Sequence, residues 1–192
     1  MQKDRTSKIN LNLKKIIFPL IFIFAANFLF AQEKSLPSGF RKIQLGMTME
    51  EVKAELLKDS QFGYRGDRDV SLLPSENRSL IETDTSKTAP YSFLERCWFQ
   101  FYNGKLYTIT LNLKTEKLDH YSVFETLRKK YGNPSFLNPE KSEWKNDSVI
   151  MSLERPLTIK YVDKKVFEDL LNQSLVNKSA QEMTREMFLD EF

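Results

Sequence analysis

The sequence has few of the residues from which catalytic and metal sites are most often built. It contains one cysteine, Cys97, and one histidine, His120, among 192 residues. A single cysteine excludes an internal disulfide, and one cysteine with one histidine cannot supply the usual four ligands of a zinc site. No catalytic motif is present either, so we expect a protein without a metal or cofactor.

Glycine is also scarce, with six residues in the chain, whereas aromatic residues make up 12%. This composition is unlike that of disordered or fibrous proteins and is typical of a domain with an apolar core. Cys97 lies in a strongly apolar segment, 93–102, where a free cysteine behaves as a small apolar residue. We therefore expect Cys97 to be buried and inert.

The first 31 residues have the order of an export signal. Five Lys or Arg residues precede an apolar run, Ile16–Phe30, which is followed by the small residue Ala31. A membrane-spanning helix needs about 20 apolar residues, so this run favours a cleaved signal peptide, with an uncleaved anchor as the alternative. We expect an exported protein, periplasmic or secreted, that begins at Gln32 after cleavage.

Removal of residues 1–31 also changes the charge. The whole chain has a net charge of +3, but the leader holds five basic residues and one acidic residue. The remaining chain has 24 basic and 25 acidic residues. A nearly neutral domain lacks the basic surface of nucleic-acid-binding proteins, so we expect no nucleic-acid partner and a membrane contact only through an uncleaved leader.

Beyond the leader, the chain predicts a short linker (32–39), a single α+β domain (40–176) and a C-terminal tail or helix extension (177–192). The length is that of one ordinary domain with a sizeable core. Residues 61–90 contain Gly, Pro and many small polar residues, and they show no sustained hydrophobic period. We predict a long loop insertion there, and such loops are usually functional or disordered.

Hydrophobic periodicity predicts helices over 49–58 and 119–131, and a last helix after Asp163. Thr48 and Glu51 have the spacing of a capping box, in which each side chain bonds a free backbone N–H of the first turn. The first helix is therefore expected to begin immediately after Thr48.

Alternation of apolar and polar residues predicts the strands. It runs on both sides of Asn103-Gly104, which indicates a β-hairpin over 91–113 with Tyr107 among the inward-facing residues. Two further strands are expected over 149–154 and 157–162. Each of the first two helices thus precedes a hairpin, which predicts two helix-plus-hairpin repeats in a largely antiparallel sheet with helices packed on it.

The two repeats would cover residues 40–113, with the loop insertion, and residues 114–176. Short motifs accompany the two helices: Gly46-Met47-Thr48 with Glu51-Val52, and Tyr131-Gly132 with Pro134. On these residues the chain resembles, over about residues 40–162, the SmpA/OmlA outer-membrane assembly lipoproteins and the β-lactamase-inhibitor protein. The resemblance implies an exported binding or scaffolding module rather than an enzyme. Unlike the lipoproteins, the chain has no cysteine after the leader to carry a lipid.

Six residues are candidates for contact with a partner, because Arg and aromatic residues are enriched at binding hot spots. Four lie in the predicted loop and two on the outward face of the predicted hairpin: Tyr64, Arg65, Arg68, Arg78, Trp98 and Tyr102. Exposed aromatic residues on a sheet face can form a docking surface. The alternative for Trp98 and Tyr102 is that another layer, such as the C-terminal helix, covers them.

We therefore expect a non-enzymatic envelope protein that binds another protein or a cell-envelope component through this loop and sheet face. Two alternatives stay open. One is a secreted inhibitor of a hydrolase, in which a projecting loop would be the main exposed apolar feature. The other is an envelope enzyme with a polar site built from residues 61–90.

Overall fold

The structure, a computed structural model, describes residues 35–73 and 77–189, and the predicted signal peptide lies outside the described residues. The strands are β1 (Gly39–Phe40), β2 (Ile43–Gln44), β3 (Val70–Leu72), β4 (Arg78–Asp84), β5 (Leu94–Tyr102), β6 (Lys105–Leu113), β7 (Phe136–Leu137), β8 (Lys141–Lys145), β9 (Val149–Glu154) and β10 (Thr158–Asp163). The α-helices are α2 (Met49–Lys58), α3 (Thr85–Thr88), α4 (His120–Tyr131) and α5 (Lys164–Leu189). Two short 3₁₀ helices are η2 (Ser60–Phe62) and η3 (Gly66–Asp69).

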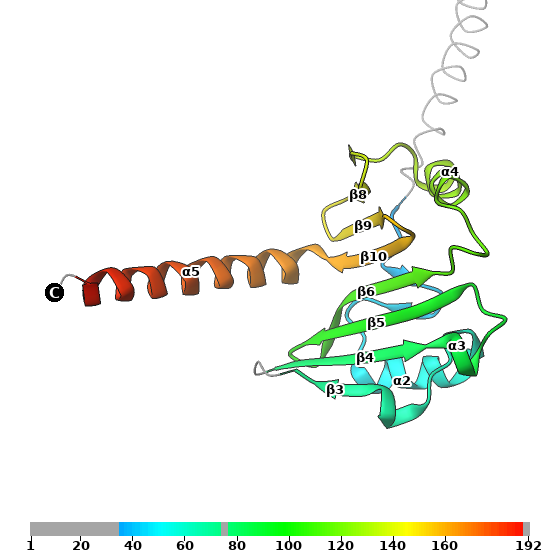
Figure 1. The fold of residues 1–192 in the computed structure, drawn as a ribbon, viewed down its shortest axis with the longest axis horizontal. Coiled ribbons are helices and arrows are strands. Elements are labelled where there is room, and N and C mark those ends of the chain that lie inside the picture. Colours follow the sequence, from blue (N-terminus) through cyan, green and yellow to red (C-terminus); the bar gives the residue numbers. More distant parts are fainter. Residues whose placement is uncertain (1–34, 74–76, 190–192) are drawn as a thin grey trace, which may run out of the picture. The chain divides into compact units, whose positions relative to one another are not determined.

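The described strands from β3 to β10 form one eight-stranded antiparallel sheet in the order β3-β4-β5-β6-β10-β9-β8-β7 (Figure 1). With its helices this is an α+β fold, as predicted. The sheet consists of two four-stranded meanders, β3 to β6 and β7 to β10, which meet where β6 pairs with β10. Each half therefore has more strands than the single hairpin that the sequence predicts, and the repeat stays a prediction.

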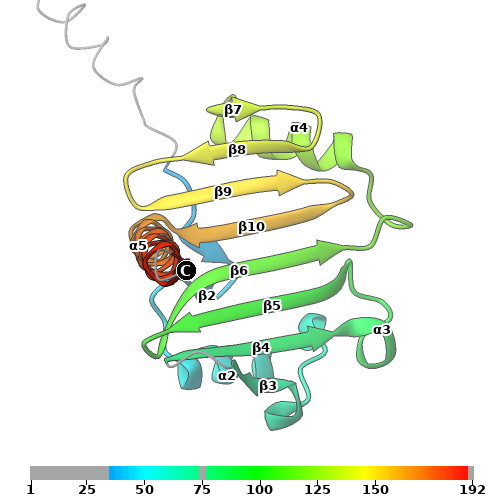
Figure 2. The ribbon, with the colours of Figure 1, turned by 60° about the vertical axis from the view of Figure 1, so that its left-hand side comes forward.

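Helices α2 and α4 lie on one face of this sheet (Figure 2), which we call the helix face. Val52 and Leu56 of α2 and Leu127 of α4 are buried in the main hydrophobic core with the inward side chains of the strands. The capping box at the start of α2 is confirmed, because Thr48 Oγ1 accepts from the N–H of Glu51 and the Glu51 carboxylate accepts from the N–H of Thr48. Local sequence signals thus position the helix against the core.

Helix α5 begins at the end of β10 and leaves the sheet on the opposite side, which we call the outer face (Figure 2). The residues predicted as a tail or helix extension belong to this helix up to Leu189. Its large apolar side chains stay exposed; Phe167, Leu171 and Leu175 are 45%, 50% and 54% exposed. The helix therefore does not lie flat across the outer face.

The segment predicted as a long loop, 61–90, is largely folded, so that prediction is wrong. It contributes the edge strand β3, the strand β4 and the short helix α3. The buried residues here include Ile81, Thr83 and Thr85, of which only one is apolar. Because two of these three buried residues are polar, the sequence shows no alternation of apolar and polar residues here. The Thr85 hydroxyl donates a hydrogen bond to the Leu94 carbonyl at 2.6 Å.

Cys97 is buried in β5, as predicted, and burial raises the pKa of its thiol to about 12. Because the thiolate is the reactive form, about 1 in 10,000 thiols would be ionised at pH 8. We expect iodoacetamide to leave Cys97 unmodified in the native protein at pH 8 and to alkylate it rapidly in urea, measured by mass spectrometry over time. Equal rates in the two conditions would contradict burial.

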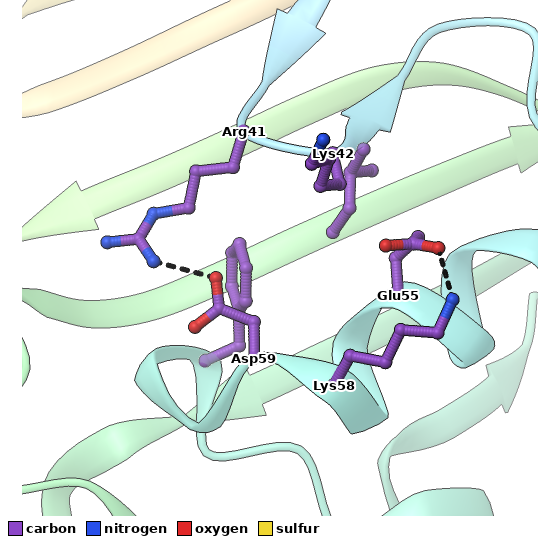
Figure 3. Close-up of a pocket in the computed structure, with 7 residues that line it drawn as sticks. Arg41, Lys42, Glu55, Lys58 and Asp59 are labelled. Atoms are coloured by element: carbon purple, nitrogen blue, oxygen red, sulfur yellow. Dashed lines mark hydrogen bonds and ion pairs between the residues drawn. The ribbon is translucent and has the colours of Figure 1, made fainter.

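A pocket of about 350 Å³ lies on the helix side of the molecule, between the β1–β2 turn and the C-terminal half of α2 (Figure 3). Its lining residues are Arg41, Lys42, Ile43, Glu55, Lys58, Asp59 and Phe62. The Phe62 ring contacts Phe99 of β5 edge to face, with ring centroids 5.8 Å apart. The base of the pocket is therefore continuous with the core.

Candidate functional site

The outer face of the sheet carries side chains in regular rows. Residues that pair directly across neighbouring strands form one row over β4, β5, β6, β10, β9 and β8: Glu82, Trp98, Thr110, Lys160, Ser152 and Glu143. Side chains directly opposite each other on neighbouring strands lie close enough to interact. The row places Trp98 among polar side chains, outside the hydrophobic core.

Around Trp98 the outer face has a small group of large side chains. We define the aromatic patch as Arg78, Leu80, Trp98, Tyr102 and Tyr107. Arg78 pairs directly opposite Tyr102, and Trp98 lies on the same face because it is four residues before Tyr102 on β5. Tyr107 joins them through a hydrogen bond from its hydroxyl to Gln100 Oε1, at 3.1 Å. All five patch residues are partly exposed.

The polar groups of this patch are available for a partner. Within residues 35–73 and 77–189, the Trp98 indole N–H and the Tyr102 hydroxyl make no hydrogen bond, and Arg78 makes no ion pair. Buried polar groups of Tyr and Trp normally find a partner, and these groups are partly exposed instead. The patch thus offers apolar area, two hydrogen-bonding groups and one positive charge.

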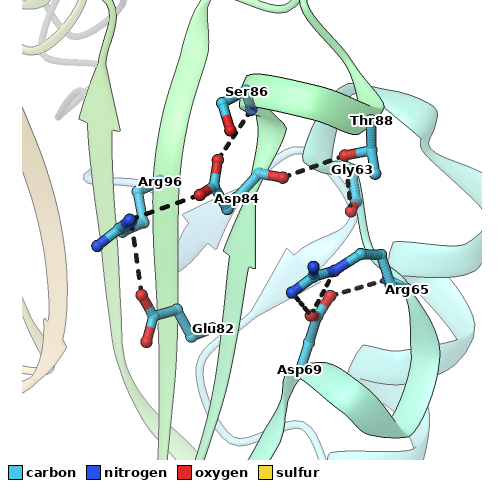
Figure 4. A network of polar contacts seen from close by, with 8 residues as sticks. All are labelled: Gly63, Arg65, Asp69, Glu82, Asp84, Ser86, Thr88 and Arg96. Carbon is cyan, nitrogen blue, oxygen red and sulfur yellow. Dashed lines mark hydrogen bonds and ion pairs between the residues drawn. The ribbon is translucent and has the colours of Figure 1, made fainter.

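Several other charges on the outer face are paired with neighbours. Arg96 forms ion pairs with Glu82 and Asp84, each at 3.5 Å (Figure 4). Hydrogen bonds from Ser86 and the charge of Arg96 lower the pKa of Asp84, so the pair persists at neutral pH. Lys160 of β10 forms an ion pair with Glu154 of β9. Arg78, by contrast, has no ion pair within residues 35–73 and 77–189.

The structure brings together three of the six predicted contact residues, Arg78, Trp98 and Tyr102, and separates the other three from them. Tyr64 packs against the core, and burial raises the pKa of its hydroxyl. Arg65 is committed to the buried carboxylate of Asp69, which accepts from its N–H and Nε (Figure 4). Arg68 is exposed on η3, immediately before the edge strand β3, and is not one of the patch residues.

The 61–90 segment is held to the rest of the domain by hydrogen bonds. The Thr88 hydroxyl lies 3.1 Å from both the Gly63 and the Asp84 carbonyl oxygens (Figure 4). Gly63 has a φ of 64°, and a Cβ there would lie 2.2 Å from the Thr88 hydroxyl, so glycine is required on both counts. Gly63 and α3 are therefore packed closely against each other.

Two patch residues, Leu80 and Tyr107, are not among the six contact residues predicted from the sequence. Leu80 lay inside the predicted loop. Tyr107 was expected to face inward, which is wrong because a register shift after Gln100 places Leu106 inward in its stead. This β-bulge cannot be predicted from the alternation of apolar and polar residues.

In the described ranges no group of three or more His, Cys, Asp and Glu side chains could hold a metal ion. Among the helices that the structure describes, none is long and apolar enough to cross a membrane.

Comparison with protein families gives one match. The model of the TP0088 domain matches residues 38–173, which include the whole sheet and the first turns of α5. The chain belongs to the TP0088 domain family. No curated protein and no solved structure matches the chain. The resemblance of this TP0088 domain to the SmpA/OmlA lipoproteins and the β-lactamase-inhibitor protein therefore stays a prediction.

Proposed function

We propose that this chain is a non-enzymatic, exported protein of the cell envelope that binds a partner protein through the aromatic patch on its outer sheet face. The observation that carries the proposal is the grouping of Trp98, Tyr102 and Arg78 with their polar groups unpaired among the described residues. Trp, Tyr and Arg are the residue types that contribute most to binding energy at interfaces. The predicted export signal is the basis for the envelope location.

The shape and charge of the face favour a protein over a small ligand. The patch lies on a broad sheet surface, and its surroundings are polar with paired charges such as Arg96 with Glu82. Charges at the rim of an interface mainly steer association and specificity, and Arg78 can form a new ion pair with a carboxylate of the partner. We therefore propose a partner that seats an apolar side chain on Trp98 and Tyr102 and brings an acidic group to Arg78.

The alternatives expected from the sequence have weaker support. A hydrolase inhibitor would present residues 61–90 as a projecting loop, yet much of this segment is strand β4 and helix α3. An enzyme built from the same segment would need a free polar cluster, yet Arg65 and Asp69 bind each other.

The test begins with capture of the partner in cells. A photoreactive amino acid replaces Thr110, next to Trp98 on the outer face, and in a control it replaces Tyr121, which is 69% exposed on α4. One protein crosslinked from position 110 and not from position 121 would support the outer face. The same protein crosslinked equally from both positions would contradict it.

The affinity of the purified full-length chain for that protein is then measured by calorimetry. We expect Trp98→Ala to weaken the Kd about tenfold or more, because a central aromatic anchor costs on the order of 2 kcal/mol when truncated. Arg78→Gln should weaken it less, and the control Tyr121→Ala should leave it unchanged. Wild-type affinity in Trp98→Ala would overturn the proposal.

A further inference from the structure

The pocket beside α2 has a charge pattern that the proposed function does not use. It lies beside α2 on the helix side of the molecule (Figure 3), whereas the aromatic patch lies on the outer face. Its rim carries three positive side chains, Arg41, Lys42 and Lys58, and two carboxylates, Glu55 and Asp59. The rim therefore has one positive charge in excess.

Both carboxylates are already paired. Arg41 Nη1 lies 2.7 Å from Asp59 Oδ2, and Lys58 Nζ lies 2.6 Å from Glu55 Oε1 (Figure 3). Lys42 is exposed and has no ion pair within the described ranges of the chain. The bond to Asp59 uses one nitrogen of the Arg41 guanidinium, and a guanidinium has five N–H donors. Lys42 and the rest of Arg41 can therefore donate to an anion.

The β1–β2 turn fixes the position of Arg41 beside the pocket. Arg41 and Lys42 form the two-residue turn between β1 and β2, and Arg41 has a φ of 56°. A positive φ is uncommon for a residue other than glycine, and here a two-residue hairpin turn requires it. The turn holds the guanidinium at the pocket rim, between Asp59 and the Phe40 ring, whose centroid is 5.6 Å away.

We propose that this pocket binds a small organic anion, in which a phosphate or carboxylate group bonds to Lys42 and Arg41. The rest of the ligand would lie against the aliphatic stems of the basic side chains, above Phe62 and Ile43, which are almost fully buried. The volume of about 350 Å³ falls within the range of small-molecule sites. Because the pocket and the aromatic patch share no residue, this site is independent of the proposed protein partner.

The probes are phenyl phosphate, benzoate and the uncharged phenol, titrated into the full-length chain and followed by two-dimensional amide NMR. We expect saturable shifts at Lys42, Ile43 and Lys58 with one or both anions and none with phenol. Tighter binding of phenyl phosphate would identify a phosphate site, and tighter binding of benzoate a carboxylate site. Equal shifts with phenol, or no shift with any probe, would overturn the proposal.

Two variants separate binding from folding. Lys42→Gln should weaken the Kd about fivefold, the size expected for one charge at an exposed rim, whereas Lys145→Gln on β8 serves as the matched control. Arg41→Gly relieves the backbone conformation, so we expect binding to be lost while the melting temperature stays within a few degrees of wild type. Unchanged affinity in both Lys42→Gln and Arg41→Gly would contradict the site.

Discussion

Phe99→Ala should lower the free energy of unfolding by about 3–5 kcal/mol, as is usual for the loss of a fully buried phenylalanine. Phe99 has no exposed surface and lies at the centre of β5, between β4 and β6. Its ring contacts Phe62 of η2, which in turn contacts Phe40 at 6.1 Å between centroids. The truncation would leave a cavity where the sheet, η2 and the β1–β2 hairpin meet.

Urea unfolding followed by circular dichroism measures this effect. The matched control is Phe93→Ala on the same hairpin, because Phe93 is 53% exposed and truncation there removes little buried area. We expect the control to cost below about 1 kcal/mol. Similar costs for the two variants would contradict the position of Phe99 in the core.

Elements whose ends are determined by neighbouring residues could be predicted from the sequence. The capping box at Thr48 and Glu51 begins α2 at Met49, as predicted, and Asn103-Gly104 closes the β5–β6 hairpin. In each case neighbouring residues provide the hydrogen bonds or the backbone conformation. These elements could therefore be located without knowledge of the rest of the chain.

Strand β4 and its contribution to the site could not be predicted in this way. Its buried residues include Thr83, a polar residue that lies opposite Cys97 where β4 pairs with β5. The same long-range pairing places Arg78 opposite Tyr102. Trp98 and Tyr102 were recognisable as surface aromatics from alternation alone, but the grouping with Arg78 depends on pairing between segments distant in sequence.

Helix α4 depends on one tryptophan in the second half of the sheet, so Trp144→Ala should also cost about 3–5 kcal/mol. Trp144 is 2% exposed, its indole N–H donates to the Gly132 carbonyl at 2.9 Å, and its ring lies 6.2 Å from that of Phe124. Truncation would empty the space between β8 and α4 and leave the carbonyl that ends the helix without this donor. Trp144→Phe would keep most of the packing and lose the hydrogen bond, at about 1–2 kcal/mol.

The matched control for this experiment is Trp98→Ala, because Trp98 is the other tryptophan of the chain and lies outside the core on the outer face. Thermal and urea unfolding should show a large loss of stability for Trp144→Ala and a clearly smaller one for Trp98→Ala, which is partly exposed. If the aromatic patch binds the partner, the affinity measurement should give the opposite ranking. Among variants that remain folded, Trp98→Ala should weaken the Kd, and Trp144→Phe should leave it unchanged. A large loss of stability in Trp98→Ala would mean that Trp98 supports the fold, and its effect on binding would then no longer be evidence for a docking surface.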